Sequence, residues 1–177
     1  MTISIHSISV ETFVPMLTTL SNLLDKGAEH ARAKGTDVNA LATARLAPDM
    51  FPLSTQVLFS CHQAKECVAC LTGQESPVLE NKEMSFAEMK SLIEKTIAHL
   101  KSLKSSAFDG AEDRQIIVPL QGTMELHVNG LQLLSEWTLP NFYFHLVTAY
   151  DILRHEGVEL GKRDYMGHVG PYIRQRG

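Results

Sequence analysis

Three polar residues in the C-terminal third of the chain have the types and the spacing of a small binding site. Asn141, His145 and Thr148 follow one another at intervals of four and three residues, with Ile152 four residues further on. On a helix this spacing places all four side chains on one face. An amide, an imidazole and a hydroxyl that meet there could orient a small polar ligand or hold part of a metal shell. The alternative is that His145 is a core histidine, hydrogen-bonded to a neighbouring helix.

The three cysteines carry a weaker chemical signal. Cys67 and Cys70 have the spacing of a redox motif, but a reactive pair is expected at a helix N-terminus, where the dipole lowers the thiol pKa. These residues fall near the end of a predicted helix instead, so we interpret them and Cys61 as small buried side chains. An odd number of cysteines suits a reducing compartment and predicts a cytoplasmic protein. His30 and His99 are predicted to be exposed rather than catalytic.

Four long helices are predicted to position these residues, because apolar side chains recur at helical spacing in four segments. Capping residues and glycines mark most of their ends. The predicted helices cover residues near 8–33, from Ser54 to Gly73, from the capping box of Ser85 and Glu88 to Lys104, and from the capping box of Asn129 and Gln132 to Gly157.

A change of period before the last predicted helix indicates a β-hairpin. The runs RQIIVPL and TMELHV are β-type segments joined through Gln121 and Gly122, and Pro119 restricts the first of them to edge-like pairing. Pro140 lies inside the last predicted helix. It should kink or split that helix, because its ring collides with the carbonyl of Glu136.

The composition predicts one domain over residues 1–177. Apolar residues make up 44% of the chain and charged residues 20%, which are ordinary values for a globular protein. The net charge of −4 argues against a nucleic-acid surface, and no apolar run approaches the roughly 20 residues that span a bilayer. The helix pattern predicts an all-α fold, an up-down four-helix bundle with long crossover connections and a small hairpin before the last helix.

Four stretches of the sequence occur in a combination that is quite specific: Arg45–Leu53 (RLAPDMFPL), Pro140–His145 (PNFYFH), Thr148–His155 (TAYDILRH) and Gly161–Gly167 (GKRDYMG). In these stretches and in its helix order, nearly the whole chain resembles the DinB/YfiT-like superfamily of four-helix bundles. The resemblance is specifically to a branch of unknown function found in bacteria and fungi. It implies a bundle that forms homodimers and has a pocket between its helices.

The wider superfamily often holds a divalent metal through three histidines, and some members use that metal to activate low-molecular-weight thiols. An alignment through Arg154 and Gly157 places His145 at the second histidine of the last-helix pair, with Asn141 at the first. The ligand on the second helix should fall near Phe59 or Ser60, and His62 is close to them. Because two of the three histidines are missing, we expect no cofactor and no stoichiometric zinc. Any metal would be held by His145 and Asn141.

Two kinds of function therefore remain open. The chain could be an enzyme, or a descendant of one, whose small-molecule pocket is lined by Gln56, Asn141, His145, Thr148 and Tyr150. His145 would then be the acid–base catalyst, since an unperturbed histidine titrates near neutrality. Alternatively, the chain is a non-catalytic binding or dimerisation module that has lost the metal site. Phe142, Tyr143 and Phe144 exceed what one core stripe can bury, which also predicts a homodimer.

Overall fold

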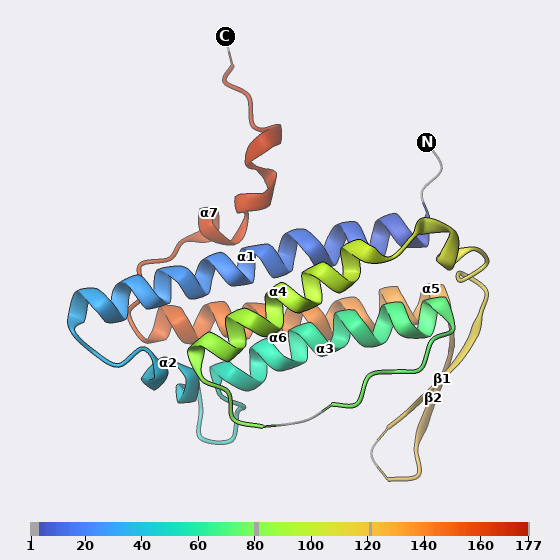
Figure 1. The fold of residues 1–177 in the computed structure, drawn as a ribbon, viewed down its shortest axis with the longest axis horizontal. Coiled ribbons are helices and arrows are strands. Elements are labelled where there is room, and N and C mark those ends of the chain that lie inside the picture. Colours follow the sequence, from blue (N-terminus) through green and yellow to red (C-terminus); the bar gives the residue numbers. More distant parts are fainter. Residues whose placement is uncertain (1–3, 80–81, 121, 177) are drawn as a thin grey trace.

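The computed structural model describes residues 4–79, 82–120 and 122–176, and its main body is a bundle of four long helices (Figure 1). α1 and α6 run in one direction, and α3 and α4 run in the other. The segment between α3 and α4 returns along the bundle, so these consecutive helices are parallel. The predicted bundle with a long crossover is confirmed. The four helices are α1 (Ile5–Lys34), α3 (Leu53–Thr72), α4 (Phe86–Ser102) and α6 (Leu139–His155).

Shorter elements connect and extend the bundle. Two antiparallel strands pair from Gln115↔Asn129 to Pro119↔Glu125 and form the predicted hairpin. Gly122 adopts a left-handed φ of 74° after the strand, while Gln121, the other predicted turn residue, lies outside the described residues. The remaining elements are α2 (Asn39–Thr43), η1 (Ser105–Phe108), β1 (Gln115–Pro119), β2 (Glu125–Asn129), α5 (Gly130–Gln132), η2 (Leu133–Thr138), α7 (Lys162–Tyr165) and η3 (Gly167–Tyr172).

The helix ends follow local capping chemistry. Ser85 and Glu88 form the predicted capping box, in which the Ser85 backbone N–H donates to the Glu88 carboxylate over 2.8 Å. Gly73 ends α3 with a left-handed φ of 69°, as predicted. Three predicted boundaries were wrong. α1 starts at Ile5 rather than near residue 8, because Ser4 and Ser7 form a capping box there. α3 starts at Leu53 directly after Pro52, so Ser54 is not its cap, and α4 ends at Ser102, which leaves Lys104 outside it. At the start of α3 and the end of α4, no side chain forms a capping hydrogen bond.

The interruption predicted at Pro140 occurs one turn earlier than expected. Leu133–Thr138 is a π-helical segment in which the Leu139 N–H reaches back to the carbonyl of Leu134. α6 begins at Leu139, so Pro140 lies in its first turn, where a residue without an N–H costs least. The wider π-helical turn therefore takes up the break, and the segment carrying Asn141 and His145 is a regular α-helix.

The four helices meet in a continuous apolar core. Phe13 of α1 and Phe142 of α6 are fully buried and pack edge to face, with ring centroids 5.0 Å apart. Other fully buried core side chains come from all four helices: Leu17, Leu20 and Leu24 of α1, Val57, Cys61 and Leu71 of α3, Met89 and Ile93 of α4, and Leu146 and Ile152 of α6. Among the described residues, no helix has the length and apolar character needed to cross a membrane.

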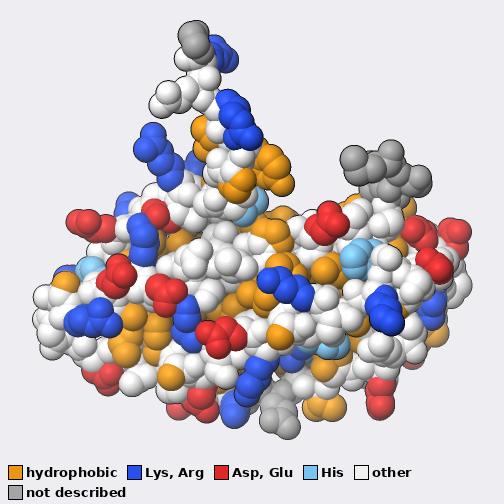
Figure 2. All heavy atoms as spheres, turned by 45° about the horizontal axis from the view of Figure 1, so that its top comes forward, with side chains coloured by type: hydrophobic (Ala, Val, Ile, Leu, Met, Phe, Trp, Pro, Cys, Tyr) orange, Lys and Arg blue, Asp and Glu red, His pale blue; other side chains and the backbone are white. Residues whose placement is uncertain are grey.

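The C-terminal segment after α7 stands away from the bundle (Figures 1 and 2). Figure 2 shows charged side chains of both signs over the bundle surface on this side. On the projecting segment, Tyr172 is 80% exposed and Ile173 is 70% exposed. This segment therefore adds little to the core, and the bundle alone positions the candidate site.

Candidate functional site

His145 of α6 faces α3, where it meets Gln56. The imidazole Nδ1 lies 2.8 Å from Gln56 Oε1, and Gln56 Nε2 donates over 3.1 Å to the carbonyl oxygen of Phe51. Because the Gln56 amide nitrogen is used as that donor, its oxygen accepts, and Nδ1 of His145 carries the hydrogen. This arrangement leaves Nε2 as the nitrogen with a lone pair. Burial lowers the pKa of His145 to about 4, so the ring is neutral at pH 7.

Aromatic rings enclose the His145 side chain. The ring of Phe59 on α3 lies 4.9 Å from the imidazole centroid, and the ring of Phe144 lies 5.3 Å from it. Phe51 extends this chain of rings, since it packs edge to face on Phe59 at 5.2 Å. These apolar neighbours displace water from the imidazole, which is the physical cause of its lowered pKa.

The other predicted site residues are not brought together in the same way. Asn141 lies one turn before His145, but its amide nitrogen donates to the Trp137 carbonyl over 2.7 Å. Thr148 is buried, and its hydroxyl donates over 2.7 Å to the Phe144 carbonyl of its own helix. Asn141 therefore bonds to the backbone of η2, and Thr148 to the backbone of α6.

Tyr150 lies apart from this group, because its ring packs against Tyr165 of α7 at 6.1 Å. Tyr150 lies five positions after His145, so its side chain points to another face of α6. Of the five residues predicted to line the site, only Gln56 and His145 touch through their polar atoms.

Apart from His145, the positions compared with the superfamily's metal ligands hold side chains other than histidine. Phe59 packs on His145, and the Ser60 hydroxyl donates to the Gln56 carbonyl over 2.9 Å. His62 lies instead 3.7 Å from Glu66 on its own helix. Within the described ranges, no three His, Cys, Asp or Glu side chains gather closely enough to hold a metal ion. A histidine with one amide oxygen is a poor donor set for zinc, so these residues do not fit that metal.

Cys61 and Cys67 are buried as interpreted from the sequence, whereas Cys70 is only half-buried. Burial raises the pKa of Cys61 to about 12 and that of Cys67 to about 12, so both remain thiols at neutral pH. Cys70 is half-buried, its sulfur lies 3.4 Å from the Ser76 hydroxyl, and burial again raises its pKa. None of the three has the lowered pKa of a redox-active thiol.

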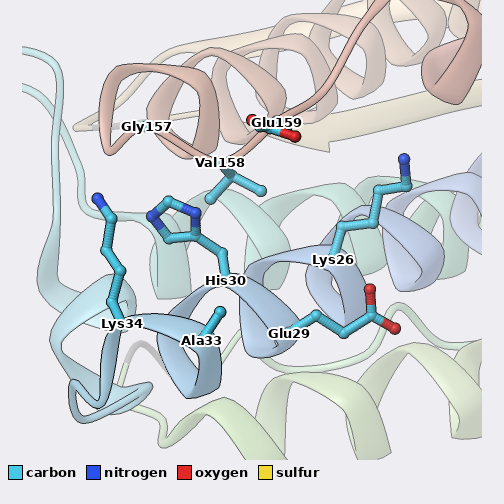
Figure 3. A pocket seen from close by; sticks show the side chains of 8 residues that line it. All are labelled: Lys26, Glu29, His30, Ala33, Lys34, Gly157, Val158 and Glu159. Atoms are coloured by element: carbon cyan, nitrogen blue, oxygen red, sulfur yellow. The ribbon is translucent and has the colours of Figure 1, made fainter.

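A groove that the sequence analysis missed lies between the C-terminal half of α1 and the turn after α6 (Figure 3). Its volume is about 620 Å³, and we call it the α1 groove. Lys26, His30 and Lys34 line it from α1, and Gly157 and Glu159 line it from the turn. His30 is half-buried there, so its predicted exposure was wrong, while His99 is exposed as predicted. The four-residue spacing of the three α1 residues was the available signal.

We expect replacement of His145 with glutamine to change how stability depends on pH. The folded pKa of about 4 lies below the ordinary 6.5, so the unfolded chain takes up a proton first as the pH falls. The wild type therefore loses free energy of unfolding between about pH 6.5 and pH 4, and is fully stabilised above that window. From pH 7 to pH 5, it should lose about 1 kcal/mol more than His145→Gln, after allowing for solvent screening of the partly exposed ring.

Urea unfolding of both proteins at the two pH values measures this difference. His99→Gln, at an exposed position on α4, is the matched control and should follow the wild type. If the wild type and His145→Gln lost the same free energy of unfolding between the two pH values, His145 would not be shielded from water.

Comparisons with known proteins agree with the fold. Residues 5–166 match a family model described as "Domain of unknown function (DUF1993)". A crystal structure of a DinB family member protein from Shewanella denitrificans is 38% identical in sequence, covers 96% of this chain and 95% of its own, and superposes with a TM-score of 0.85. No curated protein matches the chain. The resemblance inferred from the sequence is confirmed, and the chain belongs to the DUF1993 family of DinB-like helical bundles, whose function is unknown.

Proposed function

We propose that this protein is a non-catalytic binding module that pairs with a second copy of itself. The pairing surface is the outer face of α3 and α6 around His145. We define this aromatic surface by Phe51, Phe59, Phe144, His145 and Val147. The observation that carries the proposal is the continuous chain of ring contacts Phe51–Phe59–His145–Phe144, whose outer members remain exposed to solvent.

Leaving these apolar side chains exposed to water is energetically unfavourable in an isolated chain. Phe144 is 58% exposed and Phe51 is 51% exposed, and Val147 lies one turn beyond Phe144 on the same side of α6. Rings of this size contribute strongly to interfaces when they are buried. Because neighbouring rings already hold Phe59 and His145 in place, little side-chain freedom would be lost on association.

A second copy is the partner that best fits the chemistry. The polar members of the region, His145 and Gln56, are hydrogen-bonded to each other, and His145 is uncharged at neutral pH because burial lowers its pKa to about 4. An apolar, uncharged surface favours an equally apolar partner, and a two-fold axis brings the same surface of another copy against it. The homodimer implied by the superfamily resemblance supports the same partner.

An acid–base enzyme at His145 has less support. A histidine with a pKa of about 4 is a weak base at neutral pH, and the nearby Asn141 and Thr148 groups already bond to backbone carbonyls of η2 and α6. Five cavities in the described part of the chain are lined by residues other than His145. An enzymatic activity with a neutral pH optimum that is lost when His145 is replaced would support the enzymatic alternative instead.

Replacement of Phe144 with glutamate tests the proposal. Sedimentation equilibrium of the wild type at micromolar concentration should give about twice the chain mass of 19.7 kDa. A carboxylate at the centre of the surface should weaken the dimer by at least about 30-fold, the effect of losing roughly 2 kcal/mol at an interface hot spot. The same change at Ile117, which is 57% exposed on the hairpin, is the matched control and should leave the dimer intact.

Two results would contradict the proposal. The wild type could sediment as a monomer throughout the micromolar range, in which case the aromatic surface does not pair with itself. Alternatively, Phe144→Glu could remain as dimeric as Ile117→Glu, and the interface would then lie elsewhere on the chain. Circular dichroism of both variants checks that the bundle is folded.

A further inference from the structure

One end of the α1 groove is formed by the Lys34 ammonium and the His30 imidazole. Figure 3 shows both side chains directed over Gly157. A Cβ atom at Gly157 would lie 3.6 Å from Lys34 Nζ and 3.9 Å from His30 Nε2, so two nitrogens converge on one glycine. Gly157 has a φ of 85°, which favours glycine. Because glycine has no side chain, the groove stays open at this point. This end offers two donors to an anionic group.

The remaining charged residues give the groove an acidic character away from Lys34. Glu29 on α1 and Glu159 on the turn both line it. Lys26 also lines it, but its ammonium is paired with Asp164 at 2.6 Å, so its charge is compensated. Within the described part of the chain, neither Glu29 nor Glu159 takes part in an ion pair. Their carboxylates are therefore available to a cationic group.

An apolar strip separates the two kinds of charge. Val158 projects from the turn toward α1 between the labelled charged residues, and Ala33 adds a methyl group from the helix (Figure 3). Val158 is only 1% exposed, so the apolar surface open to a ligand here is mainly that of the exposed Ala33. The α1 residues that line the groove, from Lys26 to Lys34, span about 12 Å along the helix axis. A short aliphatic chain would lie over this strip without burying a polar group.

We propose that the α1 groove binds a linear zwitterion, a short aliphatic chain with a carboxylate at one end and an ammonium at the other. The carboxylate is received by Lys34 and His30, and the ammonium is received by Glu159. The methylene groups lie along Ala33. Opposite charges at both ends select against molecules with a single charge, because these leave one set of groove charges unpaired. The site is independent of self-association through the aromatic surface.

Titration with 6-aminohexanoate, followed by two-dimensional NMR, tests this site. We expect saturable shifts for amides of residues 26–34 and 157–159 and for the His30 imidazole. Hexanoate and hexylamine, which each carry one of the two charges, should bind at least about 10-fold more weakly, equivalent to about 1.4 kcal/mol. The substitutions Lys34→Gln and Glu159→Gln should each weaken the binding of 6-aminohexanoate by a similar factor. Lys101→Gln, at an exposed position on α4, is the control and should bind like the wild type.

Three outcomes would overturn the proposal. Hexanoate that binds as tightly as 6-aminohexanoate would show a site for anions alone. Binding that survives both Lys34→Gln and Glu159→Gln would lie elsewhere on the chain. Absence of saturation by 6-aminohexanoate up to high millimolar concentration would show that the groove does not recognise this class of molecule.

Discussion

Replacing Gly130 with alanine should lower the free energy of unfolding by about 3 kcal/mol or more. Gly130 begins α5, where the hairpin leads into the last helix of the bundle. A Cβ atom there would collide with the backbone carbonyl oxygen of Ala111 and would come within 2.9 Å of Leu71 Cδ2. The Leu131 N–H also donates to the Glu112 carbonyl over 3.1 Å, which holds the two segments together. A backbone atom cannot move aside as a flexible side chain can, so the methyl group must separate them.

Urea unfolding of Gly130→Ala beside Gly161→Ala measures this effect. At Gly161 an added Cβ meets nothing closer than Asp164 Oδ2 at 3.9 Å, so this control should change stability by less than about 0.5 kcal/mol. A loss below about 1 kcal/mol for Gly130→Ala would mean that the hairpin is not packed closely on the bundle.

Truncation of Phe142 to alanine should destabilise the protein by about 3–5 kcal/mol. Its ring is fully buried and packs edge to face on Phe13 at 5.0 Å and on Tyr143 at 5.5 Å. Removal of the ring loses its burial and leaves a cavity that the surrounding helices fill only in part. Because Phe142 links α1 to α6, the loss should appear as a lower midpoint of the whole cooperative transition.

Calorimetry or urea unfolding at fixed protein concentration measures the loss. Tyr172→Ala is the control for removal of an aromatic ring, since Tyr172 is 80% exposed on the projecting C-terminal segment. It should change stability by less than about 0.5 kcal/mol. If Phe142→Ala lowered the stability as little as Tyr172→Ala, the Phe13–Phe142 contact would not be central to the core.

The secondary structure was largely determined by local sequence. Apolar spacing set the four long helices, and the Ser85–Glu88 capping box fixed the start of α4 because its hydrogen bonds join residues three positions apart. Gly73 and Gly35 ended their helices in left-handed conformations that glycine adopts readily. At the start of α3 and the end of α4, where no such local signal existed, the predicted boundaries were wrong by one or two residues. At the start of α1 the Ser4–Ser7 capping box was overlooked, and the predicted start near residue 8 was wrong by three.

Proline chemistry was only partly predictable. The sequence predicted an interruption at Pro140, since proline lacks the N–H that an α-helix needs. In the structure, the interruption is the π-helical segment Leu133–Thr138, which precedes Pro140. Its form depends on how the buried Leu133, Leu134 and Thr138 side chains pack, and this packing is not encoded in the proline itself.

The tertiary structure decided which polar side chains meet. Helical spacing placed Asn141, His145 and Thr148 on one face, but a shared face does not fix side-chain rotamers. The Thr148 hydroxyl and the Asn141 amide turn to backbone carbonyl oxygens of α6 and η2, and only His145 reaches across to Gln56, 89 positions away in the sequence. The binding role predicted for these residues, the homodimer and the cytoplasmic location stay predictions.

The α1 groove depended most strongly on the tertiary structure. Lys26, His30 and Lys34 are visible in the sequence as a four-residue repeat, but their partners Gly157, Val158 and Glu159 lie more than a hundred residues later. The sequence by itself determined the helices, their caps and the family resemblance, because these rest on short-range hydrogen bonds, apolar spacing and residue combinations. The pairing of groups across the bundle was decided only by the packing of α6 against α1 and α3, because a contact between distant residues requires the whole core to form.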